Sequence, residues 1–363
     1  MRLAGVEEQE IEKRAPMPGP PVNRKIRAAL ATGSQIARDL TRKRRVLADR
    51  ETVQARKYTC KSCEHNKRGS CQKCGCLIAG KIRLAMSLCP IGKWNPGSVS
   101  VLIPARNEKY LDRTVYDLLT RAAGPVDIWI FADSWTDYRP VLNRVLANPD
   151  NRINITINDG PPVGIRRACN HLARIATGQY IYRVDAHCRF SNAWDIALKD
   201  SAADLTVVVP AMRTLDPETW TTKAPSANNY YITPAYKYDT LKDQAAGDSV
   251  KEIMCFIGAA WFCKKSTWSA LGGYDEKFYH WGESGVEWSL KTWFAGGRLV
   301  LDSRSWFAHW FRGRFPYKIS GAKIAMNREE IRNHFQAYTG PRSMEWLVNK
   351  FKPLPGWHNT KKT

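Results

Sequence analysis

The sequence has 363 residues, of which 44% are hydrophobic, so it can bury a large core and form one large domain with a smaller part. Its formal net charge of +22 is unusual for an enzyme of small-molecule metabolism and favours a polyanionic partner, either nucleic acid or an anionic membrane surface. No stretch reaches the roughly 18 apolar residues of a membrane span, and the N-terminus lacks a signal-peptide core, which predicts a cytoplasmic protein without a membrane span.

The positive charge is concentrated at the N-terminal end of the chain. Residues 1–98 contain 21 Lys and Arg against 8 Asp and Glu. Residues 1–22 end in the proline-rich "APMPGPPV", which favours a flexible arm. Residues 23–57 place apolar side chains at near-helical spacing among many cations, so this helix either lies on a polyanion or packs on the main domain. We therefore expect a basic flexible and helical arm over residues 1–58.

A cysteine-rich segment follows this arm. The stretch "CKSCEHNKRGSCQKCGCLIAGKIRLAMSLC" contains six of the ten cysteines, namely Cys60, Cys63, Cys71, Cys74, Cys76 and Cys89. Two Cys-x-x-Cys pairs are typical of a tetrahedral Zn²⁺ site, and the segment has too few large apolar residues to fold on a core of its own. An iron–sulfur cluster or free thiols are the alternatives, and which four cysteines bind is left open. We expect a zinc-binding module over residues 59–95.

From residue 96 the pattern changes to alternating strands and helices. Apolar runs predict strands over residues 99–105, 126–133, 153–157 and 179–184, and the stretches between them predict helices around 110–122, 139–147 and 164–176. This alternation is typical of an α/β fold with a mainly parallel sheet and helices on both faces. In such sheets ligands bind at the carboxyl ends of the strands.

The stretch "RVDAHCRF" places Asp185 and His187 at one of these strand ends. Side chains two apart in an extended segment point to the same side, so the carboxylate and the imidazole lie together. Such a pair suits a divalent ion, Mn²⁺ or Mg²⁺, with positions left open for water and phosphate oxygens. Taken alone, Asp-x-His is more often a hydrogen-bonded strand end than a metal site.

The order of motifs over residues 98–313 resembles GT-A glycosyltransferases of the family-2 type, and most closely the catalytic domain of polypeptide N-acetylgalactosaminyltransferases. "SVSVLIPARNEKYLDRTVYDLL" resembles the family's first nucleotide-binding strand and helix, and "VGIRRACNHLARIATGQYIYRVDAHC" the helix that leads to the metal-binding Asp-x-His. "IGAAWFCKKSTWSALGGYDEKFYHWGESGVEWSLKTWFAGG" resembles the acceptor-side block, and "WFAHWFRG" the closing segment with a third metal ligand. The resemblance implies a Rossmann-like GT-A domain over residues 96–313, followed by a C-terminal helical extension over 314–363.

The resemblance also implies the roles of individual residues. The metal ion would be held by Asp185, His187 and His309, although His309 could instead be packed in an aromatic cluster. The donor, a nucleoside-diphosphate sugar and in particular a UDP-sugar, would be contacted by a set along the first half of the domain: Pro104, Arg106, Glu108, Asp133, Arg166 and Asp185.

Two glutamates are the candidates for further catalytic work beside Asp185. Glu283 or Glu287 would act as the carboxylate base of an inverting reaction. The resembled transferases retain configuration without a dedicated base, so the prediction leans to retention. Glu287 has a plainer alternative as a salt bridge within its helix, and Trp281, Trp288 and Trp293 are expected to serve packing.

The acceptor is predicted from what precedes the catalytic domain. A basic arm and a cysteine-rich module suit DNA, with cations on the phosphates and an extruded, hydroxyl-bearing base in the pocket. Bacteriophages decorate hydroxymethylated pyrimidines with sugars, so we expect a phage DNA-modifying enzyme in the host cytoplasm, with no obligate protein partner. The alternatives are a transferase for a protein or surface polysaccharide, and a non-catalytic, zinc-containing nucleic-acid-binding protein.

Overall fold

The computed structural model describes residues 47, 50–84, 87, 89, 97–150, 152–225, 228–241, 250–278 and 282–357. The chain divides into two compact units, Met1–Trp94 and Asn95–Thr363. This division lies one residue from the boundary expected between the cysteine-rich module and the α/β domain. Within the described ranges, no helix has the length and apolar character needed to cross a membrane.

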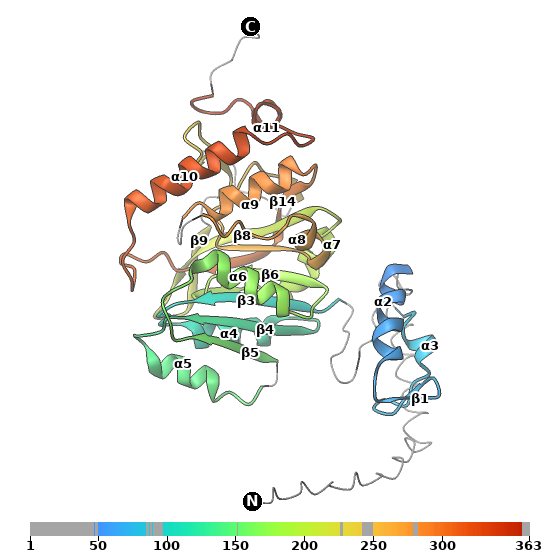
Figure 1. Ribbon diagram of the computed structural model, residues 1–363. Coiled ribbons are helices and arrows are strands. Elements are labelled where there is room, and N and C mark those ends of the chain that lie inside the picture. The colour runs from blue at the N-terminus through green and yellow to red at the C-terminus, as the bar shows by residue number, and fades with distance from the viewer. Residues whose placement is uncertain are drawn as a thin grey trace, which may run out of the picture. The chain divides into compact units, whose positions relative to one another are not determined.

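The described part of the N-terminal unit has little apolar core. Its described elements are the helices α2 (Arg50–Lys61) and α3 (Ile78–Lys81) and the antiparallel strands β1 (Asn66–Lys67) and β2 (Ser70–Cys71) (Figure 1). Among its described side chains, Ile82 is the one buried hydrophobic residue. The Arg56 guanidinium donates to the carbonyl oxygens of Ile82 (3.1 Å) and Leu84 (2.8 Å), which ties α2 to the chain after α3. The basic arm predicted over residues 1–58 lies outside the described residues except for Leu47 and part of α2.

The C-terminal unit is built on one mixed sheet. The strands run in the order β12-β14-β8-β13-β6-β3-β4-β5, and β7 and β9 pair with β14 and β8. Their bounds are β3 (Val99–Ala105), β4 (Val126–Asp133), β5 (Ile153–Asn158), β6 (Tyr180–Val184), β7 (Cys188–Phe190), β8 (Thr206–Asp216), β9 (Thr221–Pro225), β12 (Val250–Glu252), β13 (Ala260–Lys264) and β14 (Arg298–His309). Six of the eight strands on this path are parallel to one another, while β12 and β13 are antiparallel to their neighbours. The expectation of a mostly parallel sheet is confirmed.

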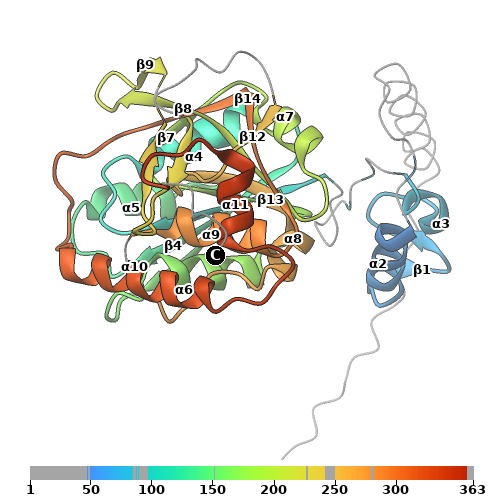
Figure 2. The same cartoon turned by 90° about the horizontal axis from the view of Figure 1, so that it is seen from above.

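Helices cover both faces of this sheet (Figures 1 and 2). α6, α8 and α9 lie on one face, and α4 and α7 lie on the other, with α5 packed beside α4. The helices are α4 (Leu111–Arg121), α5 (Arg139–Leu146), α6 (Gly164–Ile175), α7 (Trp194–Ser201), α8 (Lys265–Ala270), α9 (Ser284–Phe294), α10 (Gly321–Gln336) and α11 (Met344–Phe351). The last two occupy the region expected to be a helical extension. A separate antiparallel hairpin joins β10 (Tyr230–Ile232) and β11 (Tyr238–Thr240).

Burial on both faces explains why the central strands are continuous apolar runs. Along β3, every residue except Pro104 is buried. On the face of α8 and α9, the rings of Trp261, Trp268, Tyr274 and Trp288 stack or meet edge to face, with centroids 4.7–6.3 Å apart. Trp288 and Trp293 are core residues as expected, whereas Trp281 lies outside the described residues.

The start of α9 packs directly against the chain before β13. A Cβ atom at Gly285 would lie 2.1 Å from the carbonyl oxygen of Phe256 and 2.6 Å from the backbone nitrogen of Gly258. Only glycine permits this approach, because real Cβ atoms do not come so close to backbone atoms. The contact fixes α9, and with it Glu283 and Glu287, relative to the sheet.

Candidate active site

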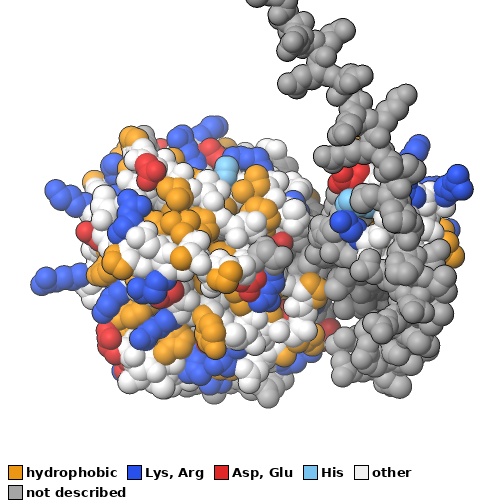
Figure 3. All heavy atoms as spheres, turned by 90° about the horizontal axis from the view of Figure 1, so that it is seen from below, with side chains coloured by type: hydrophobic (Ala, Val, Ile, Leu, Met, Phe, Trp, Pro, Cys, Tyr) orange, Lys and Arg blue, Asp and Glu red, His pale blue; other side chains and the backbone are white. Residues whose placement is uncertain are grey.

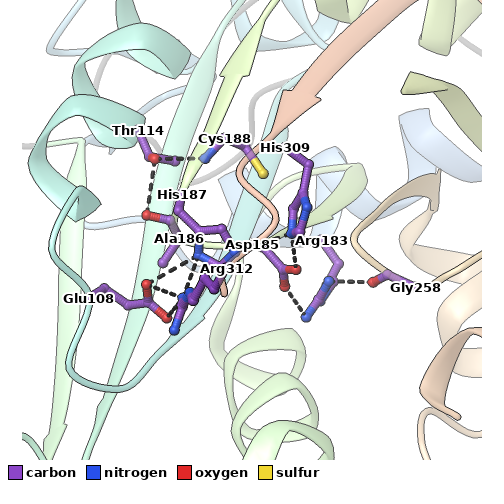
Figure 4. A network of polar contacts seen from close by, with 10 residues as sticks. All are labelled: Glu108, Thr114, Arg183, Asp185, Ala186, His187, Cys188, Gly258, His309 and Arg312. Atoms are coloured by element: carbon purple, nitrogen blue, oxygen red, sulfur yellow. Dashed lines mark hydrogen bonds and ion pairs between the residues drawn. The ribbon is translucent and has the colours of Figure 1, made fainter. Parts of the chain in front are cut away.

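Three metal-ligating side chains meet at the carboxyl ends of parallel strands (Figure 4). Asp185 and His187 follow β6, and His309 ends β14. Their ligand atoms all lie within 4.8 Å of one another. The Nε2 atoms of the two histidines are 3.1 Å apart, and His309 Nε2 is also 3.1 Å from Asp185 Oδ2. The structure therefore brings together the three residues that the sequence predicts as metal ligands.

The backbone places the two histidines side by side. In the antiparallel pairing of β7 with β14, His309 is opposite Cys188, the residue after His187. The backbone nitrogen of Trp310 donates to the carbonyl oxygen of His187 at 3.2 Å, which extends this pairing past the strand end. From α4, the Thr114 hydroxyl accepts a hydrogen bond from the Cys188 nitrogen at 3.0 Å. The turn that carries His187 is thus held from both sides.

Glu108 and Arg312 surround the other nitrogen of His187. Glu108 Oε2 lies 3.1 Å from His187 Nδ1, and Arg312 Nη2 lies 2.5 Å from Glu108 Oε1 and 2.6 Å from His187 Nδ1. Burial raises the pKa of the Glu108 carboxyl, but the facing His187 and Arg312 outweigh burial and lower it. A carboxylate beside the second ring nitrogen orients a metal-binding histidine. Glu108 therefore positions His187, and its predicted contact with the donor stays a prediction.

Arg183 holds the carboxylate of Asp185. Its Nη2 atom lies 2.6 Å from Asp185 Oδ1, and its Nη1 atom donates to the carbonyl oxygen of Gly258. Burial alone raises the pKa of the Asp185 carboxyl, but Arg183, helped by His309, holds it well below its usual value. Asp185 is therefore ionised at neutral pH, with Oδ1 on Arg183 and Oδ2 toward His309.

The donor set fits a divalent transition metal. One carboxylate oxygen and two imidazole nitrogens are ligands that Mn²⁺ accepts, and burial lowers the pKa of His309, which favours the neutral ring that a ligand requires. The Asp185 side chain is 25% exposed, whereas those of His187 and His309 are nearly buried. The group is therefore open to solvent on the side of Asp185, where phosphate oxygens would approach.

Asp133 lies at the end of β4 and caps α6. Its carboxylate accepts hydrogen bonds from the backbone nitrogens of Val163 (3.0 Å) and Gly164 (2.9 Å) and from the side-chain amide of Asn158 (2.9 Å). A carboxylate is also electrostatically favoured at a helix N-terminus. These three bonds give Asp133 a role in positioning α6, and its predicted contact with a nucleotide base stays a prediction.

Two further predicted donor contacts lie at the end of β3. Pro104 is opposite Phe131 in the pairing of β3 with β4, and it is the partly exposed residue of its strand. Arg106 follows β3, and its guanidinium lies 5.0 Å from the ring centroid of Tyr317. Both residues lie on the carboxyl-end edge of the sheet that carries the metal group, and their contacts with a donor stay predictions.

Arg166 and Glu287 form a buried ion pair instead of facing a substrate. Arg166 Nε donates to Glu287 Oε2 at 2.7 Å, and the backbone nitrogen of Asp275 donates to Oε1 at 2.7 Å. Arg166 Nη2 also donates to the carbonyl oxygen of Gly282 at 3.0 Å. Both side chains are buried and are paired with each other. This geometry gives Glu287 an ion pair with a residue of another helix, α6, while the catalytic role predicted for Glu287 and the donor contact predicted for Arg166 stay predictions.

Glu283 has the chemistry that Glu287 lacks. It precedes α9 in the left-handed conformation (φ 56°), and Oε1 accepts a hydrogen bond from Arg328 Nε at 2.7 Å. Oε2 is buried and has no hydrogen-bond partner in the part of the chain that the structure describes. Burial raises the pKa of this carboxyl, and Arg328 opposes the rise. Glu283 is therefore the glutamate with one carboxylate oxygen that accepts no hydrogen bond from the described residues, although its side chain is only 3% exposed.

Sequence reasoning missed the three arginines that hold these acids, Arg183, Arg312 and Arg328. Arg183 had a signal, because a cation within the apolar run "YIYRV" is almost never buried unless it is paired. Arg312 and Arg328 carry no such signal, since each lies in a stretch with several other cations.

The positions of the described cysteines do not confirm the zinc prediction. Across residues 50–84, 87 and 89, no three cysteine or histidine ligand atoms meet as closely as those of the Asp185 group. Lys81 Nζ lies 3.0 Å from Cys74 Sγ, and although burial raises the pKa of this thiol, Lys81 lowers it below its usual value. Burial and the neighbouring Cys74 raise the pKa of Cys76 to about 11.

Comparison with known proteins identifies the kind of domain. Residues 100–266 match the sequence model of the family described as "Glycosyl transferase family 2". The chain is 26% identical over 265 residues to polypeptide N-acetylgalactosaminyltransferase 5 of Caenorhabditis elegans, covering 67% of this chain and 42% of that protein. It is 27% identical over 257 residues to polypeptide N-acetylgalactosaminyltransferase 10 of Homo sapiens, covering 64% and 41%. The chain thus spans about two fifths of the length of these relatives.

A solved structure supports the fold. The chain matches the crystal structure of GalNAc-T7 with UDP, GalNAc and Mn²⁺, with a TM-score of 0.56 and 19% identity over 66% of this chain and 49% of that one. The C-terminal unit therefore has a GT-A type α/β fold, and its residues 100–266 are similar to glycosyltransferase family 2. The enzyme class predicted from the sequence, a glycosyltransferase, is confirmed.

Proposed function

We propose that the C-terminal unit is a metal-dependent transferase that moves a sugar from a nucleoside-diphosphate sugar to a hydroxyl acceptor. The observation that carries the proposal is the group of Asp185, His187 and His309 at the carboxyl ends of parallel strands. The GalNAc-T7 structure that shares this fold contains UDP and Mn²⁺, which supports a UDP-sugar as donor and Mn²⁺ as the ion.

The residues of the site divide the work between binding and positioning. Asp185, His187 and His309 would hold the ion, which when bound neutralises charge on the departing diphosphate. Glu108 orients the His187 ring through Nδ1, and Arg183 leaves Asp185 Oδ2 as the oxygen for the ion. Both supports pre-organise the ligands, so little rearrangement is needed when a donor binds.

The stereochemical course depends on whether a carboxylate base can reach the acceptor. Glu287 is engaged by Arg166 and a backbone nitrogen, which leaves Glu283 as the candidate. We propose transfer with retention, with Glu283 Oε2 binding a substrate hydroxyl and not removing its proton. The anomeric configuration of the product, measured by NMR, tests this: an inverted product, lost in Glu283→Gln, would show that Glu283 is a base.

The test of the function is hydrolysis of UDP-sugars by the purified full-length chain with and without Mn²⁺. Asp185→Ala should abolish the Mn²⁺-dependent release of UDP, because it removes the one charged ligand. Asp204→Ala is the matched control, since Asp204 is an exposed carboxylate whose partner is Lys264. An Asp185→Ala variant with unchanged turnover would remove the metal assignment.

We propose DNA as the acceptor, in particular a hydroxymethylated pyrimidine of phage DNA. The modification would take place in the cytoplasm of the host cell. Cations are exposed on the described part of the N-terminal unit, at Lys57, Lys61, Lys67, Arg68, Lys73 and Arg83. Cations are also spread over the face of the C-terminal unit in Figure 3. Beside the metal group, Phe311 is 48% exposed with its ring centroid 4.6 Å from that of His309, and exposed Arg314 and Phe315 follow. Such aromatic and cationic neighbours suit a base and its phosphates.

A polypeptide is the second candidate acceptor, and the relatives favour it. The proteins that match are named polypeptide N-acetylgalactosaminyltransferases, so a Ser or Thr hydroxyl could replace the base hydroxyl. Mass spectrometry distinguishes the DNA acceptor from the polypeptide acceptor. It is applied to nucleosides and to proteins from cells that make both the enzyme and hydroxymethylated pyrimidines. Glycosylated nucleosides support DNA, and glycosylated peptides with unmodified DNA support the polypeptide.

The basic surface of the N-terminal unit gives a second test of the DNA acceptor. Changing Lys67, Arg68 and Lys73 to Ala should weaken binding of duplex DNA. If each cation contacts one phosphate, the slope of log affinity against log salt concentration should fall by up to about three. Hydrolysis of the UDP-sugar should be unchanged. DNA affinity equal to that of the parent at matched salt would contradict this part of the proposal.

We also propose that the N-terminal unit binds zinc. Two Cys-x-x-Cys turns and a near absence of buried apolar side chains among its described residues support a metal-stabilised fold. Metal analysis of the purified protein should find about one zinc per chain, possible ligands being any four of the six cysteines. The Cys60→Ser, Cys63→Ser double variant should lose it, and unchanged metal content would place the ligands elsewhere.

A further inference from the structure

The C-terminal extension binds the β10–β11 hairpin through the last residues that the structure describes. The indole nitrogen of Trp357 donates a hydrogen bond to the carbonyl oxygen of Ile232 in β10 at 2.7 Å. A Cβ atom at Gly356 would lie 3.4 Å from the Pro234 side chain, so the backbone of the extension packs directly on the turn of the hairpin. Ile232 is fully buried, and its carbonyl oxygen therefore needs a donor inside the protein. Trp357 supplies this donor.

The hairpin is connected to Glu283 through the short segment that precedes β13. Tyr230 of β10 forms an isolated antiparallel bridge with Cys255 in this segment. One residue further along, the carbonyl oxygen of Phe256 lies against Gly285, the second residue of α9, and Glu283 is the N-cap of that helix. The hairpin and the start of α9 are thus both held by the same few residues.

The second strand of the hairpin carries an exposed aromatic ring. Tyr238 lies opposite Ile232 and is 38% exposed, whereas Tyr230, whose ring centroid is 5.8 Å from that of Tyr238, is buried. Burial and the negative charge of Glu283 raise the pKa of the Tyr238 hydroxyl, which shows that this side chain is within electrostatic reach of the carboxylate. Glu283 Oε2 has no hydrogen-bond partner among the described residues. A buried acceptor and an exposed aromatic ring therefore lie near each other.

This combination suits a sugar, because sugar hydroxyls need hydrogen-bond acceptors and the C–H face of a sugar ring packs on aromatic side chains. We propose that Trp357 is a positioning residue of the substrate site, which holds β10 and thereby keeps Tyr238 where it binds the transferred sugar together with Glu283. The inference rests on the proposed function and deepens it. It makes the C-terminal extension, which lies outside the family match of residues 100–266, part of the sugar site.

The experiment measures Mn²⁺-dependent hydrolysis of UDP-glucose, UDP-galactose and their N-acetyl derivatives by the full-length protein. Trp357→Phe removes the indole N–H and keeps an aromatic ring, so the Ile232 carbonyl oxygen loses its donor. We expect KM for the best donor to rise about two- to tenfold, with kcat changed less. The affinity for UDP, which has no sugar, should be unchanged in calorimetry. A KM equal to that of the parent, or an equal loss of UDP affinity, would overturn the inference.

Trp346→Phe is the matched control. Trp346 also belongs to the C-terminal extension, but its ring packs on Trp293 of α9, with ring centroids 5.9 Å apart, and on Arg342. This variant should keep the KM of the parent. A rise in KM as large as that of Trp357→Phe would show that any loosening of the extension has this effect, and would refute a specific role of Trp357.

A double-mutant cycle tests whether Trp357 acts through Tyr238. Tyr238→Ala alone should raise KM for the donor, and adding Trp357→Phe should change KM little further, because the side chain that Trp357 positions is already absent. Effects that multiply as if they were independent would contradict this route.

Hydrogen exchange of the parent protein gives a test without any substitution. The backbone amides of Thr233 and Leu241 donate hydrogen bonds within the hairpin, to the carbonyl oxygens of Lys237 and Asn229. Saturating UDP-sugar with Mn²⁺ should slow their exchange several-fold relative to UDP with Mn²⁺, since the sugar would bind against the hairpin. Equal exchange with both ligands would refute the inference and leave the proposed function intact. If no UDP-sugar is hydrolysed and UDP does not bind, the proposed function itself is wrong.

Discussion

The buried pair of Arg166 and Glu287 gives the sharpest prediction about stability. Glu287→Gln changes a charged carboxylate into a neutral amide of nearly the same shape, and it leaves the Arg166 guanidinium in a buried place opposite an uncharged group. Removing one partner of a buried ion pair costs about 3–5 kcal/mol, because the remaining charge is uncompensated. The hydrogen bond from the Asp275 nitrogen, 2.7 Å from Oε1, is weakened as well. We therefore expect a loss of about 3–5 kcal/mol in the free energy of unfolding.

Urea unfolding, followed by tryptophan fluorescence, measures this loss, because Trp288 lies one residue from the substitution and is fully buried. The double variant Arg166→Met, Glu287→Leu removes both charges of the pair and should be more stable than either single variant, even though Lys291, 3.9 Å from Glu287 Oε1, loses its carboxylate partner as well. A Glu287→Gln variant that unfolds at the parent's urea concentration but has lost all turnover would refute the reasoning, and would return Glu287 to a catalytic role.

Three further predictions concern other contacts of the site. Glu108→Gln should weaken Mn²⁺ binding in the presence of UDP by about 10–100-fold, because the His187 ring loses its carboxylate partner. Electron paramagnetic resonance measures this affinity, and an unchanged value would contradict the prediction. Burial raises the pKa of the Glu283 carboxyl, and Arg328 opposes the rise. Arg328→Ala should therefore raise this pKa further in the folded protein. The variant should keep its stability at low pH, where Glu283 is protonated, and lose stability as the pH rises through the higher folded-state pKa. Urea unfolding should thus show a larger deficit for Arg328→Ala at neutral pH than at about pH 4, and an equal deficit at both would exclude the ion pair as its cause. Gly285→Ala should destabilise by about 1–3 kcal/mol or more, since its Cβ would lie 2.1 Å from the Phe256 carbonyl oxygen, and a thermal midpoint equal to the parent's would contradict this packing.

The sheet was predictable because its strands are buried on both faces. A strand covered by helices on either side is apolar at most positions, and β3 and β4 show this as runs broken inside the strand by Ser100 and by Asp127. The predicted helices at 110–122, 139–147 and 164–176 correspond to α4, α5 and α6 within one residue at each end. Asp185 and His187 were predictable for the same reason, since a strand end fixes the side to which alternate residues point.

The partners of the predicted acids could not be read from the sequence. Glu108 meets His187 across 79 positions and Arg312 across 204, and no local pattern reports pairings over such separations. The sequence predicted a ligand contact for Asp133 and for Arg166 but not their partners inside the protein, which are the N-terminus of α6 and, 121 positions away, Glu287. The same charged residue types contact ligands and form the ion pairs that position the surrounding structure. Their partners in three dimensions distinguish the two roles.

Glu283 and Glu287 show how this distinction bears on mechanism. They are four residues apart at the start of one helix, and either could stand for the acid of the resembled family. Both oxygens of Glu287 accept hydrogen bonds from donors inside the protein, so its affinity for any further donor is low. Glu283 gives one oxygen to Arg328 and keeps the other without a partner among the described residues, in a place where an unsatisfied acceptor costs about 1–3 kcal/mol. Under the proposed function, a substrate hydroxyl that binds this oxygen would remove that cost, and for this reason we propose Glu283, and not Glu287, as the residue that contacts the substrate.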